Sequence, residues 1–368
     1  MKPGRVLIMA GGTGGHVYPA LAVADCLAQR GWQVDWVGTD RGIESRVVPA
    51  AGFLLHKLAV LGIRGKGLVS RFKGLLYLLW SGVQALRLVR RVRPDVVLGM
   101  GGYAAGPAGL AAALLRIPLV IHEQNAVAGT TNRLLAPLAR RVLSGLPGAF
   151  NGKRVVQVVG NPVRAEIAAV HFERGDLHDC FDATRPLRLL VLGGSLGAAP
   201  INDLLPQAVV VLVEAGEGAR LEVRHQCGER HAEAAQSAWS HVVDARVEVL
   251  PFIEDMAAAY AWADLVVCRA GALTVSELAV TGTPAILVPL PHAIDDHQTR
   301  NAEILSRAGA GILLPQATMT PASLAQHIQD LLDKPADLQR MSRAARIVAR
   351  VTATETVADV IEEVANGA

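Results

Sequence analysis

The stretch MAGGTGGHVYPALAVA, residues 9–24, places four glycines, a threonine and a histidine between an apolar run and a helical pattern. Glycines at this density let a backbone approach a ligand closely, and the N–H groups at a helix N-terminus attract phosphate. A tight turn alone explains one or two glycines better than four. We therefore expect a phosphate or pyrophosphate beside this loop, and His16 next to the reacting atoms.

A nicotinamide-binding loop is the main alternative for this stretch. Such a loop has the pattern G-x-G-x-x-G, with an acidic residue at the end of the second strand. Here Gly12, Gly14 and Val17 break the pattern, and Asp35 falls inside the apolar run QVDWVG rather than at its tip. The sequence therefore disfavours a nicotinamide cofactor.

Two further glycine loops follow apolar runs. GMGGYAAGPAG covers residues 99–109, and GGSLGA covers residues 193–198. Ser195 in the latter can donate its hydroxyl to a phosphate oxygen, although a helix N-cap explains a serine there equally well. Three glycine loops on two domains predict two phosphorylated ligands, one for each domain.

The stretch CRAGALTVSELAVTGTPAILVP, residues 268–289, predicts a strand that ends at Cys268, a small-residue turn and a helix from near Leu273. Thr274 and Ser276 are expected in the first turn of that helix, with Glu277 just behind them. A carboxylate near a helix N-terminus can be a capping device. At a strand-to-helix junction it can also accept hydrogen bonds from both hydroxyls of a ribose.

The organisation of the chain points to two α/β domains. A strand, a glycine loop and a helix follow one another from Arg5 and again from Leu187, half of the 368 residues apart. Short apolar runs alternate with helical patterns elsewhere, as in buried parallel sheets. We expect two doubly wound parallel-sheet domains facing each other across a cleft, with a boundary near residues 158–167.

The lengths of the apolar runs and the cysteine spacing indicate the cellular compartment. The apolar run VLIMA is shorter than the roughly 7–15 residues of a secretory signal core, and no uninterrupted run reaches the ~18 residues of a membrane span. The four cysteines have neither metal-ligand nor redox spacing, which favours reduced thiols. We expect a protein of the cytoplasm.

Charge is concentrated in one window. Residues 45–94 hold ten Lys and Arg and no Asp or Glu, so a chain of net charge +3 carries −7 elsewhere. A helical stretch in this window has more apolar residues at helical spacing than one buried face requires. The buried face can be formed by Leu78, Leu86, Leu88 and Val89. The apolar residues expected partly outside the core are Phe72, Leu75, Leu79 and Trp80. Apolar residues ringed by bases favour an anionic membrane surface as partner, and no nucleic acid.

Seven blocks in order, from GGTGGHVYPALAVA to DDHQTRNA, closely resemble the MurG family along almost the whole chain. That family moves N-acetylglucosamine (GlcNAc) from UDP-GlcNAc to undecaprenyl-pyrophosphoryl-MurNAc-pentapeptide (lipid I), and makes lipid II for peptidoglycan. The resemblance implies the GT-B architecture and a peripheral protein on the cytoplasmic side of the inner membrane. Residues 1–163, with a last helix of about 351–368, would bind acceptor and membrane, and residues 164–350 would bind UDP-GlcNAc.

The resemblance also implies site residues. Ile253 would offer backbone groups to uracil, Glu277 would hold the ribose, and Gln298 the sugar. The implied donor contacts are Thr13, Gly14, Gly15, Asn125, Arg164, Ser195, Ile253, Ala272, Leu273, Thr274, Val275, Ser276, Glu277 and Gln298. The implied contacts to the acceptor diphosphate are Gly12, Gly102 and Tyr103. The family often has Gln at the position of Leu196 and Arg near Ala199, so this chain lacks those two side chains.

The implied reaction inverts the anomeric carbon, because the donor is an α-glycoside and the product linkage is β. His16 is the expected base that takes the proton of the acceptor C4 hydroxyl, and binding of a diphosphate is its alternative role. Glu123 is a second candidate base, for which packing at a strand end is the favoured explanation. Without an Asp-x-Asp motif we expect no metal and no tightly bound cofactor, and Arg164 and helix dipoles would stabilise the leaving diphosphate.

Two other functions remain open from the sequence. A UDP-GlcNAc 2-epimerase would share the two-domain architecture but needs no lipid acceptor. A non-catalytic sensor would bind UDP-GlcNAc without turnover.

Overall fold

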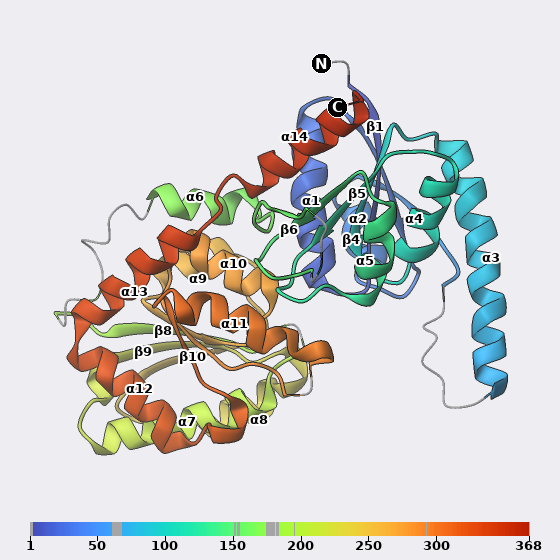
Figure 1. The fold of residues 1–368 in the computed structure, drawn as a ribbon. Helices are drawn as coiled ribbons and strands as arrows, with labels where there is room; N and C mark the ends of the chain where they lie inside the picture. Colours follow the sequence, from blue (N-terminus) through green and yellow to red (C-terminus); the bar gives the residue numbers. More distant parts are fainter. Residues whose placement is uncertain are drawn as a thin grey trace. The chain divides into compact units, whose positions relative to one another are not determined.

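The computed structural model describes residues 3–60, 68–150, 152, 155–173, 181, 184–194, 196–291 and 293–367, without the side chains of residues 68–79 and Ile294. The chain forms two compact units (Figure 1). The first is Met1–Arg164 with Thr352–Ala368, and the second is Ala165–Val351. The boundaries expected from the sequence, after residue 163 and after residue 350, each lie one residue before the boundaries in the structure.

The first unit is built on a parallel sheet of seven strands in the order β3-β2-β1-β4-β5-β6-β7. Its strands are β1 (Arg5–Ala10), β2 (Gln33–Gly38), β3 (Leu54–Lys57), β4 (Val96–Gly101), β5 (Leu119–Glu123), β6 (Arg141–Ser144) and β7 (Gln157–Val158). Every residue of β4 and β5 is buried, as expected where helices cover both faces of a parallel sheet.

Helices cover this sheet on both sides because successive side chains of a strand point to opposite faces. Val6 and Ile8 of β1 pack in one core with α1 and α14, whereas Leu7 and Met9 pack in another with α3 and α4. The helices are α1 (Gly14–Gln29), α2 (Glu44–Ala50), α3 (Leu68–Val92), α4 (Ala105–Leu114), α5 (Thr130–Leu135) and α14 (Ala353–Ala365). A 3₁₀ turn, η1 (Ala136–Leu138), follows α5.

The C-terminal helix α14 lies beside α1, although more than 300 residues separate them in the chain (Figure 1). The indole Nε1 of Trp32 donates to Glu362 over 3.1 Å. A guanidinium nitrogen of Arg30 lies 2.7 Å from Asp359. These contacts assign the last helix to the first unit.

The second unit repeats the arrangement with a parallel sheet of six strands, in the order β10-β9-β8-β11-β12-β13. Its strands are β8 (Leu187–Leu192), β9 (Leu221–Gln226), β10 (Arg246–Leu250), β11 (Leu265–Cys268), β12 (Ala285–Leu287) and β13 (Gly311–Leu313). Its α-helices are α6 (Ala165–Glu173), α7 (Ala199–Glu214), α8 (Ala232–Trp239), α9 (Met256–Trp262), α10 (Ala272–Thr281), α11 (His297–Arg307), α12 (Pro321–Asp333) and α13 (Pro335–Val348).

Both sheets reverse their strand order beside their first strand, between β1 and β4 and between β8 and β11. Ligands of doubly wound sheets bind outside the carboxyl ends of the strands at such a point. Three of the predicted segments follow these strands: the glycine loops after β1, β4 and β8. The predicted fold class, two doubly wound parallel-sheet units, is confirmed.

Candidate functional site

The first glycine loop packs against the loop after β4. Thr13 is the N-cap of α1, and Gly12 has a φ of 91°, which favours glycine. A Cβ on Gly102 would lie 2.5 Å from the Gly11 carbonyl oxygen, and one on Gly101 would lie 2.9 Å from the His16 ring. The two loops therefore meet only because their contacting residues are glycines, and they hold His16 at the point where the strand order reverses.

His16 is half-buried, and its Nδ1 lies 3.2 Å from the Gly11 carbonyl oxygen and 3.5 Å from Thr13 Oγ1. A carbonyl oxygen only accepts, so the neutral ring that bonds Gly11 carries its proton on Nδ1. The basic lone pair of that tautomer is then on Nε2.

Glu44 holds this loop in place through its side chain, and the sequence analysis did not identify it as part of the site. Its fully buried carboxylate accepts hydrogen bonds from the Gly12 N–H (2.9 Å), the Thr39 N–H (2.9 Å) and Thr39 Oγ1 (2.8 Å). Burial raises the pKa of Glu44, but these hydrogen bonds outweigh it and hold the pKa below its usual value. Glu44 is therefore ionised at neutral pH.

Three glycines make room for this carboxylate. A Cβ on Gly11 would lie 2.7 Å and one on Gly38 2.5 Å from Glu44 side-chain atoms, and one on Gly42 would also overlap it. From the sequence alone, an acid at the start of a short helix suggests only a favourable interaction with the helix dipole. The two glycines shortly before it in the chain, Gly38 and Gly42, were the signal in the sequence that the carboxylate turns inward.

The remaining predicted contacts of the first unit surround this loop and the end of β4. Tyr103 follows Gly102 and is 59% exposed. The Arg164 guanidinium lies over the ring of Tyr18, on α1, at 5.6 Å from its centroid. Arg164 is the last residue of the first unit before the chain passes to the second.

Glu123, the second candidate base, organises the loop after β5. It is buried, and it accepts from the backbone N–H groups of Asn125 (3.0 Å) and Gly129 (3.0 Å) and from the side-chain amides of Asn125 (3.1 Å) and Asn132 (2.8 Å). These four hydrogen bonds give Glu123 a structural role in holding the loop. They also orient Asn125, which is one of the predicted contacts to UDP-GlcNAc. Burial also lowers the pKa of the neighbouring His122 to about 4.

The second glycine loop is held by Gln226, the last residue of β9. The Gln226 side chain accepts from the Gly194 N–H (2.9 Å) and donates to the carbonyls of Gly194 (3.1 Å) and Pro251 (3.1 Å). Gln226 thus links this loop to the one between β10 and α9, which contains Ile253. The predicted contact Ser195 lies outside the described residues, and Leu196 is 76% exposed.

Helix α10 begins at Ala272, one residue earlier than expected, with Gly271 as its N-cap. The expectation that Ser276 lies in the first turn was therefore wrong: it lies in the second turn, where its hydroxyl donates to the Ala272 carbonyl over 3.0 Å. Glu277 is 5% exposed, and its Oε2 accepts from the Tyr260 hydroxyl over 2.9 Å. Burial raises the pKa of the Cys268 thiol to about 12, and the negative charge of Glu277 adds a smaller contribution.

Gln298 stands in the first turn of α11, where its side-chain oxygen accepts from the Leu290 N–H over 2.9 Å. Asp295 and Asp296, just before it, both have a positive φ, at 54° and 52°. The Asn301 side chain of α11 donates to the Ala270 carbonyl over 3.1 Å. The predicted sugar contact is thereby tied to the loop after β11.

The predicted donor contacts are divided between the units. Those in the first are Thr13, Gly14, Gly15, Asn125 and Arg164, and those described in the second are Ile253, the run Ala272 to Glu277, and Gln298. Within the described ranges no group of three or more His, Cys, Asp or Glu side chains could hold a metal ion.

The predicted membrane contacts lie on α3. Trp80 is 52% exposed and Val83 is 43% exposed, whereas Leu88 and Val89 are buried in the core. The side chains of Phe72, Leu75 and Leu79 lie outside the described residues. In the part of the chain that the structure describes, every helix is too short or too polar to cross a membrane.

Known proteins resemble both units. Residues 6–144 match the glycosyltransferase family 28 N-terminal domain, and residues 188–364 match the glycosyltransferase family 28 C-terminal domain. The UDP-N-acetylglucosamine–N-acetylmuramyl-(pentapeptide) pyrophosphoryl-undecaprenol N-acetylglucosamine transferase of Pseudomonas paraeruginosa is 56% identical over 364 residues, 99% of each chain.

Solved structures agree with this. The crystal structure of Acinetobacter baumannii MurG has a TM-score of 0.84 and 41% identity, and the match covers 98% of this chain and 100% of that one. A putative UDP-N-acetylglucosamine 2-epimerase from Listeria monocytogenes has a TM-score of 0.68 at 14% identity, covering 100% of this chain and 98% of that one, which shows the shared fold alone. The chain therefore belongs to glycosyltransferase family 28 and, within it, to the MurG family.

Proposed function

We propose that this protein transfers GlcNAc from UDP-GlcNAc to the C4 hydroxyl of lipid I, which forms lipid II for peptidoglycan synthesis. The observation that carries this proposal is the 56% identity, over 99% of the chain, to a relative with that activity. The glycine loops at the reversal points of both sheets are consistent with two phosphorylated substrates.

The donor binds chiefly to the second unit in this proposal. The N-terminus of α7 and the loop before it, with Ser195, attract the diphosphate. Backbone groups at Ile253 meet the uracil, and the buried Glu277 accepts from the ribose hydroxyls. Gln298 binds the sugar, and its anchoring to Leu290 supports this by fixing the amide. Arg164 neutralises charge on the leaving diphosphate, and the step uses no tightly bound cofactor.

His16 acts as the general base. Its Nδ1 contact with Gly11 supports the role, because it places the basic lone pair on Nε2. A neutral imidazole can accept the hydroxyl proton. The deprotonated oxygen then attacks the anomeric carbon as the UDP leaves, with inversion.

The acceptor diphosphate binds beside the first glycine loop, at Gly12, Gly102 and Tyr103. The Gly12 N–H already donates to Glu44, so Gly12 contributes the open space around its α-carbon rather than a donor. Because glycine has no side chain, the acceptor can approach His16 closely at this position.

The first unit docks on the cytoplasmic side of the inner membrane through α3 and the bases around it. Exposed Trp80 among these bases supports this. Replacing Leu75, Leu79 and Trp80 with serine should weaken sedimentation with anionic vesicles and leave the affinity for UDP-GlcNAc intact. Equal binding of the wild type to neutral and anionic vesicles contradicts docking, and an unfolded variant contradicts the exposure of the stripe.

The transfer reaction is tested with lipid I and UDP-GlcNAc carrying a labelled sugar. We expect label in lipid II only when both substrates are present. The same protein incubated with UDP-GlcNAc alone is the control: UDP-ManNAc there identifies an epimerase, and binding without turnover in either mixture identifies a sensor.

A further inference from the structure

A groove lies between the edge strand β3 and helix α3 of the first unit. Its residues have no part in the proposed donor and acceptor sites, although its bases belong to the basic window of residues 45–94. It has a volume of about 510 Å³, and a second hollow of about 370 Å³ adjoins it. The two share Lys57, Leu58 and Gln84. Hollows of this size accommodate small ligands or the head of a larger one.

Three cationic side chains line the larger hollow: Lys57, Arg87 and Arg91. Within the described residues none of them has a carboxylate partner, whereas Arg30 pairs with Asp359 at 2.7 Å. Arg87 and Arg91 stand four residues apart on α3, where like charges repel. The dipole at the C-terminal end of α3 favours Arg91 in the last turn, but it does not reach Arg87.

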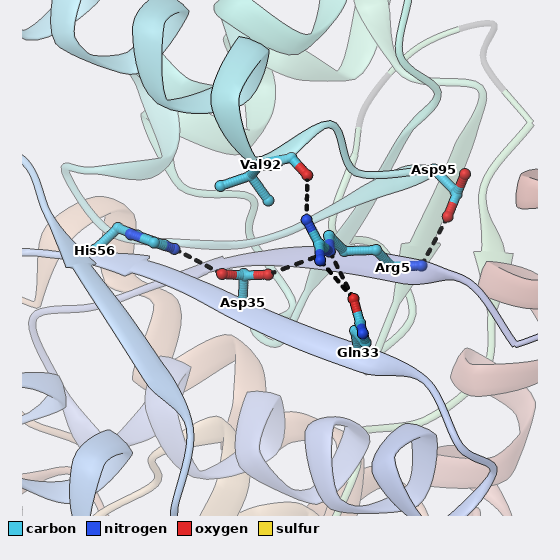
Figure 2. A network of polar contacts seen from close by, with 6 residues as sticks. All are labelled: Arg5, Gln33, Asp35, His56, Val92 and Asp95. Atoms are coloured by element: carbon cyan, nitrogen blue, oxygen red, sulfur yellow. Dashed lines mark hydrogen bonds and ion pairs between the residues drawn. The ribbon is translucent and has the colours of Figure 1, made fainter.

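Two acids near the groove, Asp35 and Asp40, already have partners. Asp35 of β2 lies between His56, whose Nε2 is 2.6 Å from one carboxylate oxygen, and Arg5, whose Nε is 3.8 Å from the other (Figure 2). Asp40, which lines the smaller hollow, lies 3.9 Å from the Nε of Arg41. Within the described residues the cations of the groove are therefore left without a carboxylate partner, and a bound anion would balance their charge.

The walls of the groove are fixed. The Gln84 side chain of α3 accepts from the Ala59 N–H over 3.2 Å, just beyond β3. Further along α3, Arg5 of β1 donates to the Val92 carbonyl over 2.6 Å (Figure 2). These two contacts tie the helix to the sheet, so the backbone positions that carry the cations are set before a ligand arrives.

Leucines complete the lining. Leu58 and Leu88 are buried beneath the cations, at 4% and 5% exposure. We infer that this groove is a binding site for a phosphate group, separate from the diphosphate sites of the transfer reaction. Lys57, Arg87, Arg91 and the NH₂ group of Gln84 supply the donors, and a phosphate ester or a lipid phosphodiester provides the matching chemistry.

The test follows the reactivity of Lys57 in the full-length protein. Its amine is acetylated with a limiting reagent and the modified peptide is quantified by mass spectrometry, with Lys334 of the second unit as internal reference. Saturating inorganic pyrophosphate should slow labelling of Lys57 about fivefold or more and leave Lys334 unchanged, because a bound anion blocks the amine.

Matched variants separate the groove from diffuse charge. Arg87→Gln with Arg91→Gln should weaken the protecting effect about tenfold or more in pyrophosphate concentration. Arg46→Gln with Arg90→Gln removes the same charge from exposed positions outside the groove and should preserve protection. All four side chains are exposed, and an unchanged KM for UDP-GlcNAc confirms that both variants fold.

Vesicles distinguish the two sources of phosphate. A lipid head group in the groove is identified when phosphatidylcholine vesicles protect Lys57 only if they contain phosphatidylglycerol, and when this protection is lost in Arg87→Gln with Arg91→Gln but kept in Arg46→Gln with Arg90→Gln. The second condition separates the groove from docking of the whole basic face. Protection by pyrophosphate only identifies a soluble anion. The site is refuted if neither probe protects Lys57, if phosphatidylcholine alone protects it equally, or if both double variants lose protection to the same extent.

Discussion

The glycine loops after β1 and β8 occupy the same place in the two units, yet different chemistry supports them. In each, a glycine N–H donates over 2.9 Å to a side chain 32 residues later, from Gly12 to Glu44 and from Gly194 to Gln226. Glu44 is an ionised carboxylate, whereas Gln226 is a neutral amide. A negative charge beneath a loop opposes the attraction of its helix N-terminus for an anion.

Two loops of the same form therefore differ in the charge that faces their N–H groups. We propose that the negative charge under the first loop makes it the weaker of the two diphosphate sites. The neutral amide under the second loop leaves the field of α7 available to an anion, in keeping with the proposed donor site. We therefore expect substitution of His16 to affect the chemical step, and changes at the second loop to affect donor binding.

The largest expected effect is at the first loop. His16→Ala should lower kcat by roughly 10²–10⁴-fold if His16 is the base, with little change in the KM for UDP-GlcNAc. Steady-state kinetics at saturating lipid I measure both. A near-normal kcat with a raised KM for the acceptor would assign His16 to binding.

The next effect concerns the second unit. Glu277→Ala should lower kcat/KM for UDP-GlcNAc roughly 30–150-fold, about 2–3 kcal/mol, because charge-assisted hydrogen bonds to the ribose are lost. Tyr260→Phe is the control, since it removes only the hydroxyl that donates to Glu277. Wild-type kinetics for Glu277→Ala would remove this carboxylate from the donor site.

Exchanging the support of the second loop tests the comparison directly. Gln226→Glu should raise the KM for UDP-GlcNAc about tenfold, equal to 1.4 kcal/mol, by placing negative charge beneath the diphosphate. Gln226→Met breaks the same hydrogen bonds without adding charge. If both variants raise KM equally, the charge beneath the loop is irrelevant.

The smallest effect on catalysis is expected from Glu44→Gln, which acts mainly on stability. The loss of charge-assisted hydrogen bonds should cost about 1–3 kcal/mol in the free energy of unfolding at pH 7. Because the folded pKa lies below the unfolded value of 4.5, this stabilisation is present above pH 4.5 and is lost as pH falls through the folded pKa. Thermal unfolding of both proteins should therefore converge on acidification, and a constant difference in Tm would show that Glu44 is not ionised in the fold.

Much of the architecture could be predicted from short stretches. Apolar runs such as DVVLGMGG predict buried strands, and β4 is buried throughout. The start of α10 was misplaced by one residue because Gly271, Ala272 and Leu273 carry no capping side chain that marks the boundary. Such a shift suffices to move Ser276 into the second turn, where its hydroxyl donates to the Ala272 carbonyl.

Short stretches of sequence are enough to predict where strands end in glycine loops, which residues stand on the helices that follow, and where bases are concentrated. Those features depend on neighbours within a few residues, through backbone sterics and hydrophobic periodicity. Other features depend on contacts between distant parts of the chain: Glu44 accepts from the Gly12 N–H, Gln226 joins Gly194 to Pro251, and Asp35 contacts Arg5 and His56. Such partners lie on separate strands and helices, and they meet only when the sheet sets their order and burial requires each polar group to find a hydrogen bond.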